Sequence, residues 1–217
     1  MGRDYKPGGL CVLTHNINHF DEWWSIGVEY AIASRARETF EGGSKQVGKS
    51  LFFWNMLSSV GAVTAAMDGE APPFYPDEVS EKAMAPLNRV ARVQSVKCSP
   101  ARASSKPTDE MNSNCPSLFA AREIEVLEPS VILAMGNPAL ECIATLGPQE
   151  ISWDDLPYPE GYKRGRVTLN GRLTEVLWIW HPVARGKTPW RTSQDHLVTD
   201  LSFSPLRSGH PPSPPTK

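Results

Sequence analysis

The chain has 217 residues, 40% of them hydrophobic, which is enough for one α/β domain with a sizeable core. Its formal net charge of -2 excludes a global attraction to nucleic acid, so any phosphate contact must come from local clusters of lysine and arginine. The sequence has neither an 18-residue apolar run nor a signal-peptide core at its start, which predicts an intracellular protein, cytoplasmic or nucleoid-associated, with no membrane partner.

The domain boundaries follow from changes in composition. The first 25 residues contain one short apolar run, residues 10–13, followed by a polar stretch. We expect residues 1–25 to be an N-terminal segment packed on the core and residues 26–205 to form the α/β domain. Residues 206–217 are rich in proline and are expected to be a disordered tail.

The first half of the domain contains one clear helical pattern. Apolar residues recur with a helical period over residues 49–60, and Gly61 stands where such a helix would end. Residues 67–80 are acidic and contain prolines, which is typical of a surface loop. Residues 90–96 alternate well enough to predict a strand that ends just before Lys97.

The second half contains the strongest strand signals. Residues 116–127 predict a helix that ends before Pro129, and residues 131–135 form a continuous apolar run typical of a buried strand. A second helix is expected over residues 138–146. Residues 150–174 read as irregular, and residues 176–180 as the last clear strand. The apolar side predicted for the first of these helices consists of Leu118, Phe119, Ala121, Ile124 and Leu127.

These elements predict a three-layer α/β/α sandwich with a mostly parallel central sheet, because a continuous apolar strand needs helices on both faces. His181 directly follows the last strand. In open α/β sheets, ligands bind at the carboxyl ends of the strands. His181 is therefore the first candidate for a functional residue.

Three motifs occur in a fixed order along the chain: Lys97-Cys98 with Pro100, Lys106-Pro107 and Glu110; Pro129 to Met135 followed by Gly136 and Ala139; and His181-Pro182. In this order and spacing they resemble the uracil-DNA glycosylase superfamily over most of the chain, and are nearest to its iron-sulfur-containing branch.

The resemblance implies a monofunctional DNA glycosylase that acts as a monomer on DNA. Such an enzyme hydrolyses the N-glycosidic bond of a flipped uracil-like or modified pyrimidine base and leaves an abasic site, in DNA repair or in defence against modified viral DNA. His181 matches the histidine that donates a hydrogen bond to the leaving base and stabilises its negative charge, as an oxyanion hole does.

Three departures from the family pattern concern the base and the attacking water. Gln94 stands where the family has its base-reading asparagine, and Gln46 where an aromatic residue stacks on the base, although Phe52 could substitute. Two residues are candidates for activating the water. Glu29, close to Gly27, is slightly favoured by its spacing, and Asn16 by its place after an apolar run.

The cysteines predict no intact iron-sulfur cluster. Cys98 and Cys115 match two of the four ligands of the iron-sulfur branch, but Cys11 is the only cysteine near the N-terminus, and four thiolates are usually required. Cys142 lies within a predicted helix and is expected in the core. No cofactor is therefore expected, with Cys98, Cys115 and Cys11 as candidate ligands if a cluster forms.

Basic and aromatic residues in the loops are the candidates for DNA contact. Phosphate ligands are expected among Lys97, Ser99, Arg102, Lys106, Arg185, Lys187 and Arg191. Further basic candidates are Arg89, Arg92, Lys163, Arg164 and Arg166. Trp153, Tyr158, Tyr162 and Trp190 could stack on bases.

Two other functions fit the same sequence. A degenerate motif near Gly27 with no water activator would give a catalytically inactive family member that binds DNA or protein. A small-molecule N-glycosidase with the same fold would not need the basic loops.

Overall fold

The fold is built around one six-stranded sheet with the strand order β2-β1-β3-β6-β5-β4. The structure, a computed structural model, describes residues 2, 4–14, 51–73, 85–95, 108–146, 150–157, 160–182, 190–204 and 206. Four strands are parallel to one another: β1 (Leu10–Thr14), β2 (Val90–Gln94), β3 (Val131–Met135) and β6 (Arg172–Ile179). Two further strands complete the sheet: β5 (Tyr162–Leu169) pairs in antiparallel fashion with β6, and β4 (Ser152–Trp153) pairs in antiparallel fashion with β5.

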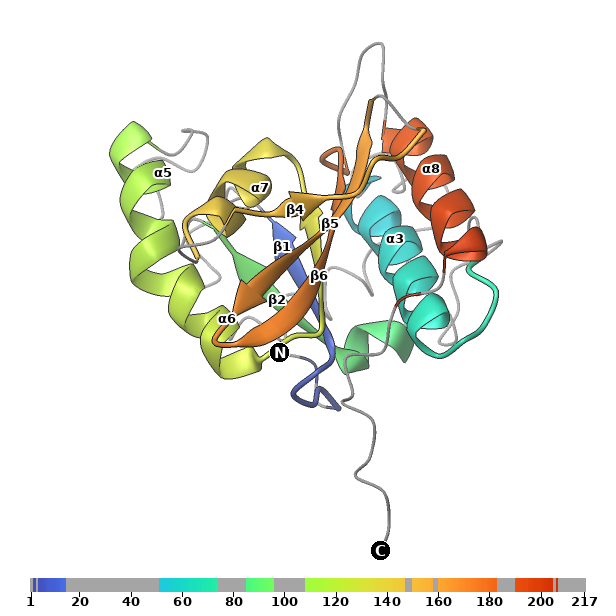
Figure 1. The fold of residues 1–217 in the computed structure, drawn as a ribbon, viewed down its shortest axis with the longest axis horizontal. Helices are drawn as coiled ribbons and strands as arrows, with labels where there is room; N and C mark the ends of the chain where they lie inside the picture. Colours follow the sequence, from blue (N-terminus) through green and yellow to red (C-terminus); the bar gives the residue numbers. More distant parts are fainter. Residues whose placement is uncertain are drawn as a thin grey trace, which may run out of the picture.

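Helices cover both faces of the sheet, so the predicted three-layer α/β sandwich with a mostly parallel sheet is confirmed (Figure 1). On one face lie α3 (Leu51–Met67) and α8 (Trp190–Phe203). On the other lie α7 (Asn137–Ala144) and a long helical segment. That segment consists of α5 (Asp109–Cys115), the π-helical η3 (Pro116–Ala120) and α6 (Ala121–Leu127). A short 3-10 helix, η2 (Ala85–Arg89), precedes β2.

Alternate residues of the inner strands enter two separate cores. Leu133 of β3 packs on the α3 and α8 side with Val60 and Leu197, while its neighbour Ala134 packs on the α7 side with Ile143. This alternation follows from the pleat of a strand, whose successive side chains point to opposite faces. Both faces of β3 are buried, which explains its continuous apolar sequence.

The N-terminal strand lies inside the sheet. β1 pairs with β2 on one side and β3 on the other, and all five of its residues are buried. Its run of apolar residues therefore has the same origin as that of β3. The expectation that residues 1–25 are a segment packed on the core does not hold for β1, which is part of the domain itself.

Helix α3 continues past the expected stop at Gly61. Apolar side chains beyond this point, Val63 and Ala66 among them, join the core, and their burial outweighs the weak helix propensity of one glycine. The helix ends instead at Met67, and the chain turns at Gly69, which has a φ of +75°. There the N–H groups of Gly69 and Glu70 donate to the carbonyls of Ala66 and Ala65, the hydrogen bonds of a Schellman motif.

The helical segment before β3 starts earlier than predicted and buries only part of the predicted apolar side. It begins at Asp109, where the Thr108 hydroxyl accepts a hydrogen bond from the Met111 N–H. The prediction that Leu118 and Phe119 are buried is wrong, because they are 60% and 46% exposed. The π-helical turn shifts the helical period, so that Ala120 faces the core together with Ile124, which was correctly placed on the apolar side.

The region predicted to be irregular, residues 150–174, contains β4, β5 and the first part of β6. Asn170 and Gly171 join β5 to β6 and have φ values of +50° and +76°. Two positive φ values in a two-residue connection are the signature of a type I′ hairpin turn, for which Asn-Gly is the favoured pair. The turn signal was present in the sequence, but the charged residues of β5 concealed the strand.

Candidate active site

The carboxyl ends of the four parallel strands form a row across one edge of the sheet. Thr14 of β1 lies opposite Gln94 of β2 on one side and Met135 of β3 on the other, and Met135 lies opposite Ile179 of β6. The residues that follow these positions are therefore brought together at one edge. This edge is where open α/β sheets bind their ligands.

His181 lies against Gly136 at this edge. A Cβ atom at position 136 would be 3.2 Å from the Cβ of His181 and 3.6 Å from its ring carbon Cδ2. The Gly136 N–H also donates to the carbonyl of Ile179, at 2.9 Å. Two of the motifs singled out in the sequence, the glycine after β3 and the histidine after β6, thus meet in the fold, and the partly buried imidazole stands beside the start of α7.

Position 136 requires glycine for two reasons, its backbone conformation and the close approach of His181. Its φ of +90° and ψ of +165° lie in a region that only glycine adopts readily. We expect Gly136→Ala to lower the free energy of unfolding by about 1–3 kcal/mol and to displace His181. Urea denaturation measures the first effect, and the NMR signals of the His181 ring measure the second.

Gly61→Ala is the matched control, because Gly61 lies in the interior of α3 and nothing lies within 4 Å of the added Cβ. Alanine is the better helix former, so this variant should gain stability, by up to about 1 kcal/mol. Equal stability of the Gly136→Ala variant and the wild type would contradict the strain at position 136.

The loop that contains His181 is held from two helices. The Trp180 N–H donates to the Ser193 hydroxyl of α8, at 3.2 Å, and the Pro182 carbonyl accepts a hydrogen bond from the Asn55 amide of α3. Sequence reasoning missed Asn55 and Ser193. No local pattern marks them, because both contacts depend on the packing of two helices against the end of β6.

Gln94 stands at the opposite end of the row from His181. It ends β2, is partly buried, and is separated from the end of β6 by three strand spacings, about 14 Å. Next to it, Arg92 places its Nη2 atom 3.4 Å from the Thr14 hydroxyl. Burial lowers the pKa of Arg92 to about 10, so it stays cationic at neutral pH below the ends of β1 and β2.

Several predicted site residues lie outside the part of the chain that the structure describes. These are the water-activating candidates Asn16 and Glu29, the pocket residues Gly27 and Gln46, and six of the seven DNA-binding candidates, Lys97, Ser99, Arg102, Lys106, Arg185 and Lys187. Phe52 lies in the first turn of α3, but its side chain is not described. The predictions for these residues stay predictions.

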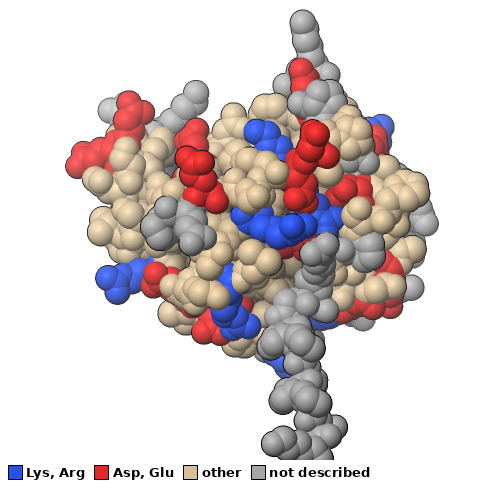
Figure 2. Space-filling model, in the orientation of Figure 1, with Lys and Arg blue, Asp and Glu red and all other residues tan. Residues whose placement is uncertain are grey.

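Three of the further basic candidates are engaged elsewhere. Arg89 forms a two-pronged ion pair with Asp68 near the amino end of β2, at the edge of the sheet opposite to His181. Arg166 lies 3.5 Å from Asp154. Arg164 is 4% exposed and cannot contact DNA. On the face shown in Figure 2, basic and acidic side chains are interspersed.

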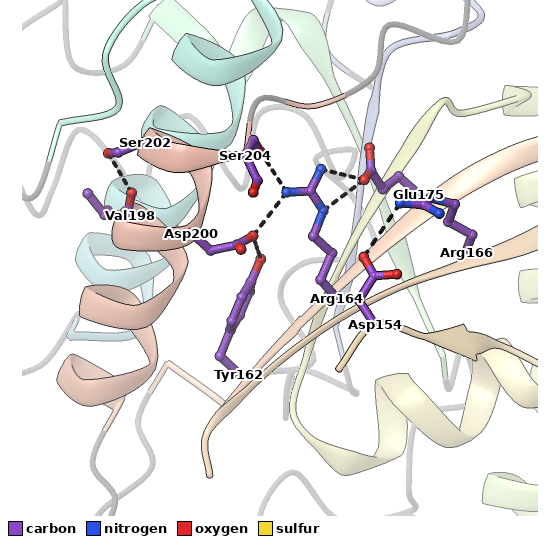
Figure 3. Close-up of polar contacts among 9 residues, drawn as sticks. All are labelled: Asp154, Tyr162, Arg164, Arg166, Glu175, Val198, Asp200, Ser202 and Ser204. Carbon is purple, nitrogen blue, oxygen red and sulfur yellow. Dashed lines mark hydrogen bonds and ion pairs between the residues drawn. The ribbon is translucent and has the colours of Figure 1, made fainter. Parts of the chain in front are cut away.

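Arg164 is the centre of a buried charge cluster between the sheet and α8 (Figure 3). Its guanidinium lies 2.6 Å from Glu175 Oε1 and 3.0 Å from Asp200 Oδ2, which also accepts a hydrogen bond from the Tyr162 hydroxyl at 2.7 Å. Burial and the charge of Asp200 raise the pKa of Tyr162 well above its usual value. Burial opposes the charge of Arg164, but its two carboxylate partners outweigh this, and its pKa is raised.

Two of the aromatic candidates for base stacking belong to the core. Tyr162 and Trp190 are 1% and 5% exposed, so the prediction that they stack on bases is wrong; their rings fill the core on the α8 side. Trp153 is 37% exposed, and the Lys163 ammonium lies 5.6 Å from the centre of its ring. Tyr158 lies outside the described residues.

The described cysteines lie in the core. Cys11, Cys115 and Cys142 are buried, as expected for Cys142, and burial raises the pKa of the Cys142 thiol to about 12. A thiol with a raised pKa is a poor metal ligand, since thiolates bind metals. Among the described residues, no three His, Cys, Asp or Glu side chains are grouped to hold a metal ion. Cys98 lies outside them, so the expectation of no cluster is untested.

Comparisons with known proteins do not assign the chain to a family. No protein-family model matches the chain, and no curated protein matches its sequence. Within the described part of the chain, no helix has the length and apolar character needed to cross a membrane.

Proposed function

We propose that the protein is a DNA glycosylase that hydrolyses the N-glycosidic bond of a flipped, uracil-like or modified pyrimidine base. The main support is the contact of His181 with Gly136 at the carboxyl edge of the parallel strands. It joins two of the three motifs that resemble the uracil-DNA glycosylase superfamily. The edge they share is also where this class of sheet binds ligands.

The side chains at this edge suit the chemistry of base removal. Breaking the bond leaves negative charge on the departing base, and a histidine N–H donor can stabilise that charge. Gln94, at the other end of the row, carries an amide that can both donate to and accept from a base edge. A base that lies over the ends of β1 and β3 would be located between His181 and Gln94.

Gln94 favours a base other than plain uracil. The family has an asparagine at the matching position, and glutamine moves the same amide outward by one methylene. A pocket that is built to hydrogen-bond one base strongly rejects a base that would leave one of the pocket's polar groups unpaired. We therefore expect the preferred substrate to be a modified pyrimidine, whether the role is repair or defence.

Arg191 is the one predicted phosphate ligand that the structure describes. It is exposed in the first turn of α8, two residues before Ser193, which contacts the His181 loop. We expect Arg191→Ala to weaken DNA binding similarly for all DNA sequences. The slope of log K against the logarithm of the salt concentration should fall in magnitude by about 1. Fluorescence anisotropy at several salt concentrations measures both.

Arg172→Ala is the control for Arg191. Arg172 is also an exposed arginine, but it begins β6, at the opposite edge of the sheet, where it pairs with Glu128. Its replacement should leave both affinity and salt slope unchanged. Equal losses for the two variants would show that DNA does not approach the His181 edge.

The test of the proposed function is incubation with duplex and single-stranded DNA that carries a panel of modified pyrimidines. Alkali-labile abasic sites should form with at least one substrate. DNA binding without cleavage of any substrate would overturn glycosylase activity in favour of an inactive binding module. Loss of both binding and cleavage would leave a small-molecule N-glycosidase.

A further inference from the structure

His181 lies between two residues whose backbones are bonded to different helices. On its amino side the Trp180 N–H donates to the Ser193 hydroxyl of α8, and on its carboxyl side the Pro182 carbonyl accepts from the Asn55 amide of α3. The two bonds bracket one residue. They therefore restrict the backbone of His181, and with it the direction in which the imidazole leaves the chain.

Asn55 is itself buried and contacts a second polar residue of α3. It is 4% exposed, and its backbone carbonyl lies 3.1 Å from the hydroxyl of Ser59, one turn further along α3. That hydroxyl is also 2.6 Å from Oε1 of Gln194, the neighbour of Ser193 in α8. One proton on Ser59 serves either acceptor. Both helices and the loop are thus joined through one buried set of polar groups.

A buried amide at position 55 has a cost that an apolar residue would avoid. Burying an amide destabilises the fold unless it is hydrogen-bonded, whereas leucine or alanine in the same helix would pack without this requirement. The Pro182 carbonyl accepts a hydrogen bond from the Nδ2 of this amide. This bond also reaches across 127 positions of sequence to the one loop that contains the candidate catalytic histidine.

We propose that Asn55, together with Ser193, is a positioning residue that holds His181 at the leaving base; this inference rests on the proposed glycosylase function. Neither residue has to touch the substrate. Each acts through the backbone of residues 180–182. Small errors in the placement of a reacting group cost rate, and a displacement of 1 Å can lower it by about 100-fold.

The test compares Asn55→Ala and Ser193→Ala with Thr64→Ala. Thr64 is a buried polar residue of α3 whose hydroxyl donates to Val60 and Gly61 of the same helix, so its loss affects stability without affecting the loop. The first readout is the NMR signal of the His181 ring, assigned with His181→Gln, which requires no substrate. The second is the division of the effect between kcat and KM on a cleaved DNA.

Displaced His181 signals in both loop variants, with wild-type signals in Thr64→Ala, would support the inference, as would a fall in kcat of about 10- to 100-fold at nearly constant KM. Unchanged His181 signals in folded Asn55→Ala and Ser193→Ala would overturn it. If Asn55→Ala does not fold, Ser193→Ala, which removes one hydroxyl, gives the same test. Because the NMR readout is independent of catalysis, an inactive wild type would overturn the proposed function and leave the positioning of His181 to be judged by the ring signals.

Discussion

The variant His181→Ala is expected to remove bases about 100- to 1,000-fold more slowly than the wild type, while DNA binding changes little. In the proposed function, the histidine stabilises the negative charge that develops on the departing base, and the intact substrate lacks this charge. Its loss should therefore lower kcat and leave the affinity for the intact substrate nearly unchanged. Single-turnover excision assays and anisotropy measure the two quantities.

His196→Gln is a suitable control, because His196 is a partly buried histidine in α8 rather than at the strand ends. It should retain the wild-type rate. A His181→Ala variant that excises bases as fast as the wild type would show that the leaving base is stabilised by another group. A variant that loses DNA affinity instead of rate would assign His181 to binding.

Arg164→Ala should be strongly destabilising, with a loss of about 3–5 kcal/mol in the free energy of unfolding. The side chain is 5% exposed and neutralises two buried carboxylates, Glu175 and Asp200. Without it, both charges are left in the core between the sheet and α8. Urea denaturation of the variant measures the loss.

Arg172→Ala gives the comparison for Arg164, because Arg172 lies in the same hairpin and pairs with Glu128, but its side chain is 49% exposed. Exposed ion pairs contribute between nothing and about 1 kcal/mol, so this variant should be close to the wild type. If the two variants lose the same stability, burial does not determine the strength of the Arg164 cluster.

The Arg164 cluster also explains why the β5–β6 hairpin could not be predicted. The sequence Lys163-Arg164-Gly165-Arg166 is typical of a solvated loop, and Arg164 alone would not be buried. Its partners lie 11 and 36 residues away, on β6 and α8. A buried ion pair conceals a strand from any pattern based on hydrophobicity, because the partners that neutralise its charge come close only in the folded chain.

The elements that define the candidate site were easier to predict. β3 and the second half of β6 are continuous apolar runs; Gly136 directly follows β3, and His181 lies two residues after the end of β6. Parallel strands place such following residues at one edge. Sequence reasoning could therefore place both residues at the ends of strands.

The contacts around His181 were beyond sequence reasoning. Asn55 reaches Pro182 over 127 residues, and Ser193 reaches Trp180 only because α8 folds back beside β6. In both cases a side chain bonds to a backbone group, which leaves no complementary residue type to recognise. The exposed Leu118 and Phe119 show the same limit within one helix, since a π-helical turn shifts the period that sequence patterns assume.

The most direct test of the proposed function is to identify the product by mass spectrometry after incubation with the substrate that gives alkali-labile sites. We predict that the wild type releases the intact free base in an amount equal to the abasic sites, and that His181→Ala releases it only slowly. DNA that stays uncut across the panel, or release of a nucleotide instead of a free base, would contradict hydrolysis of the N-glycosidic bond at this edge of the sheet.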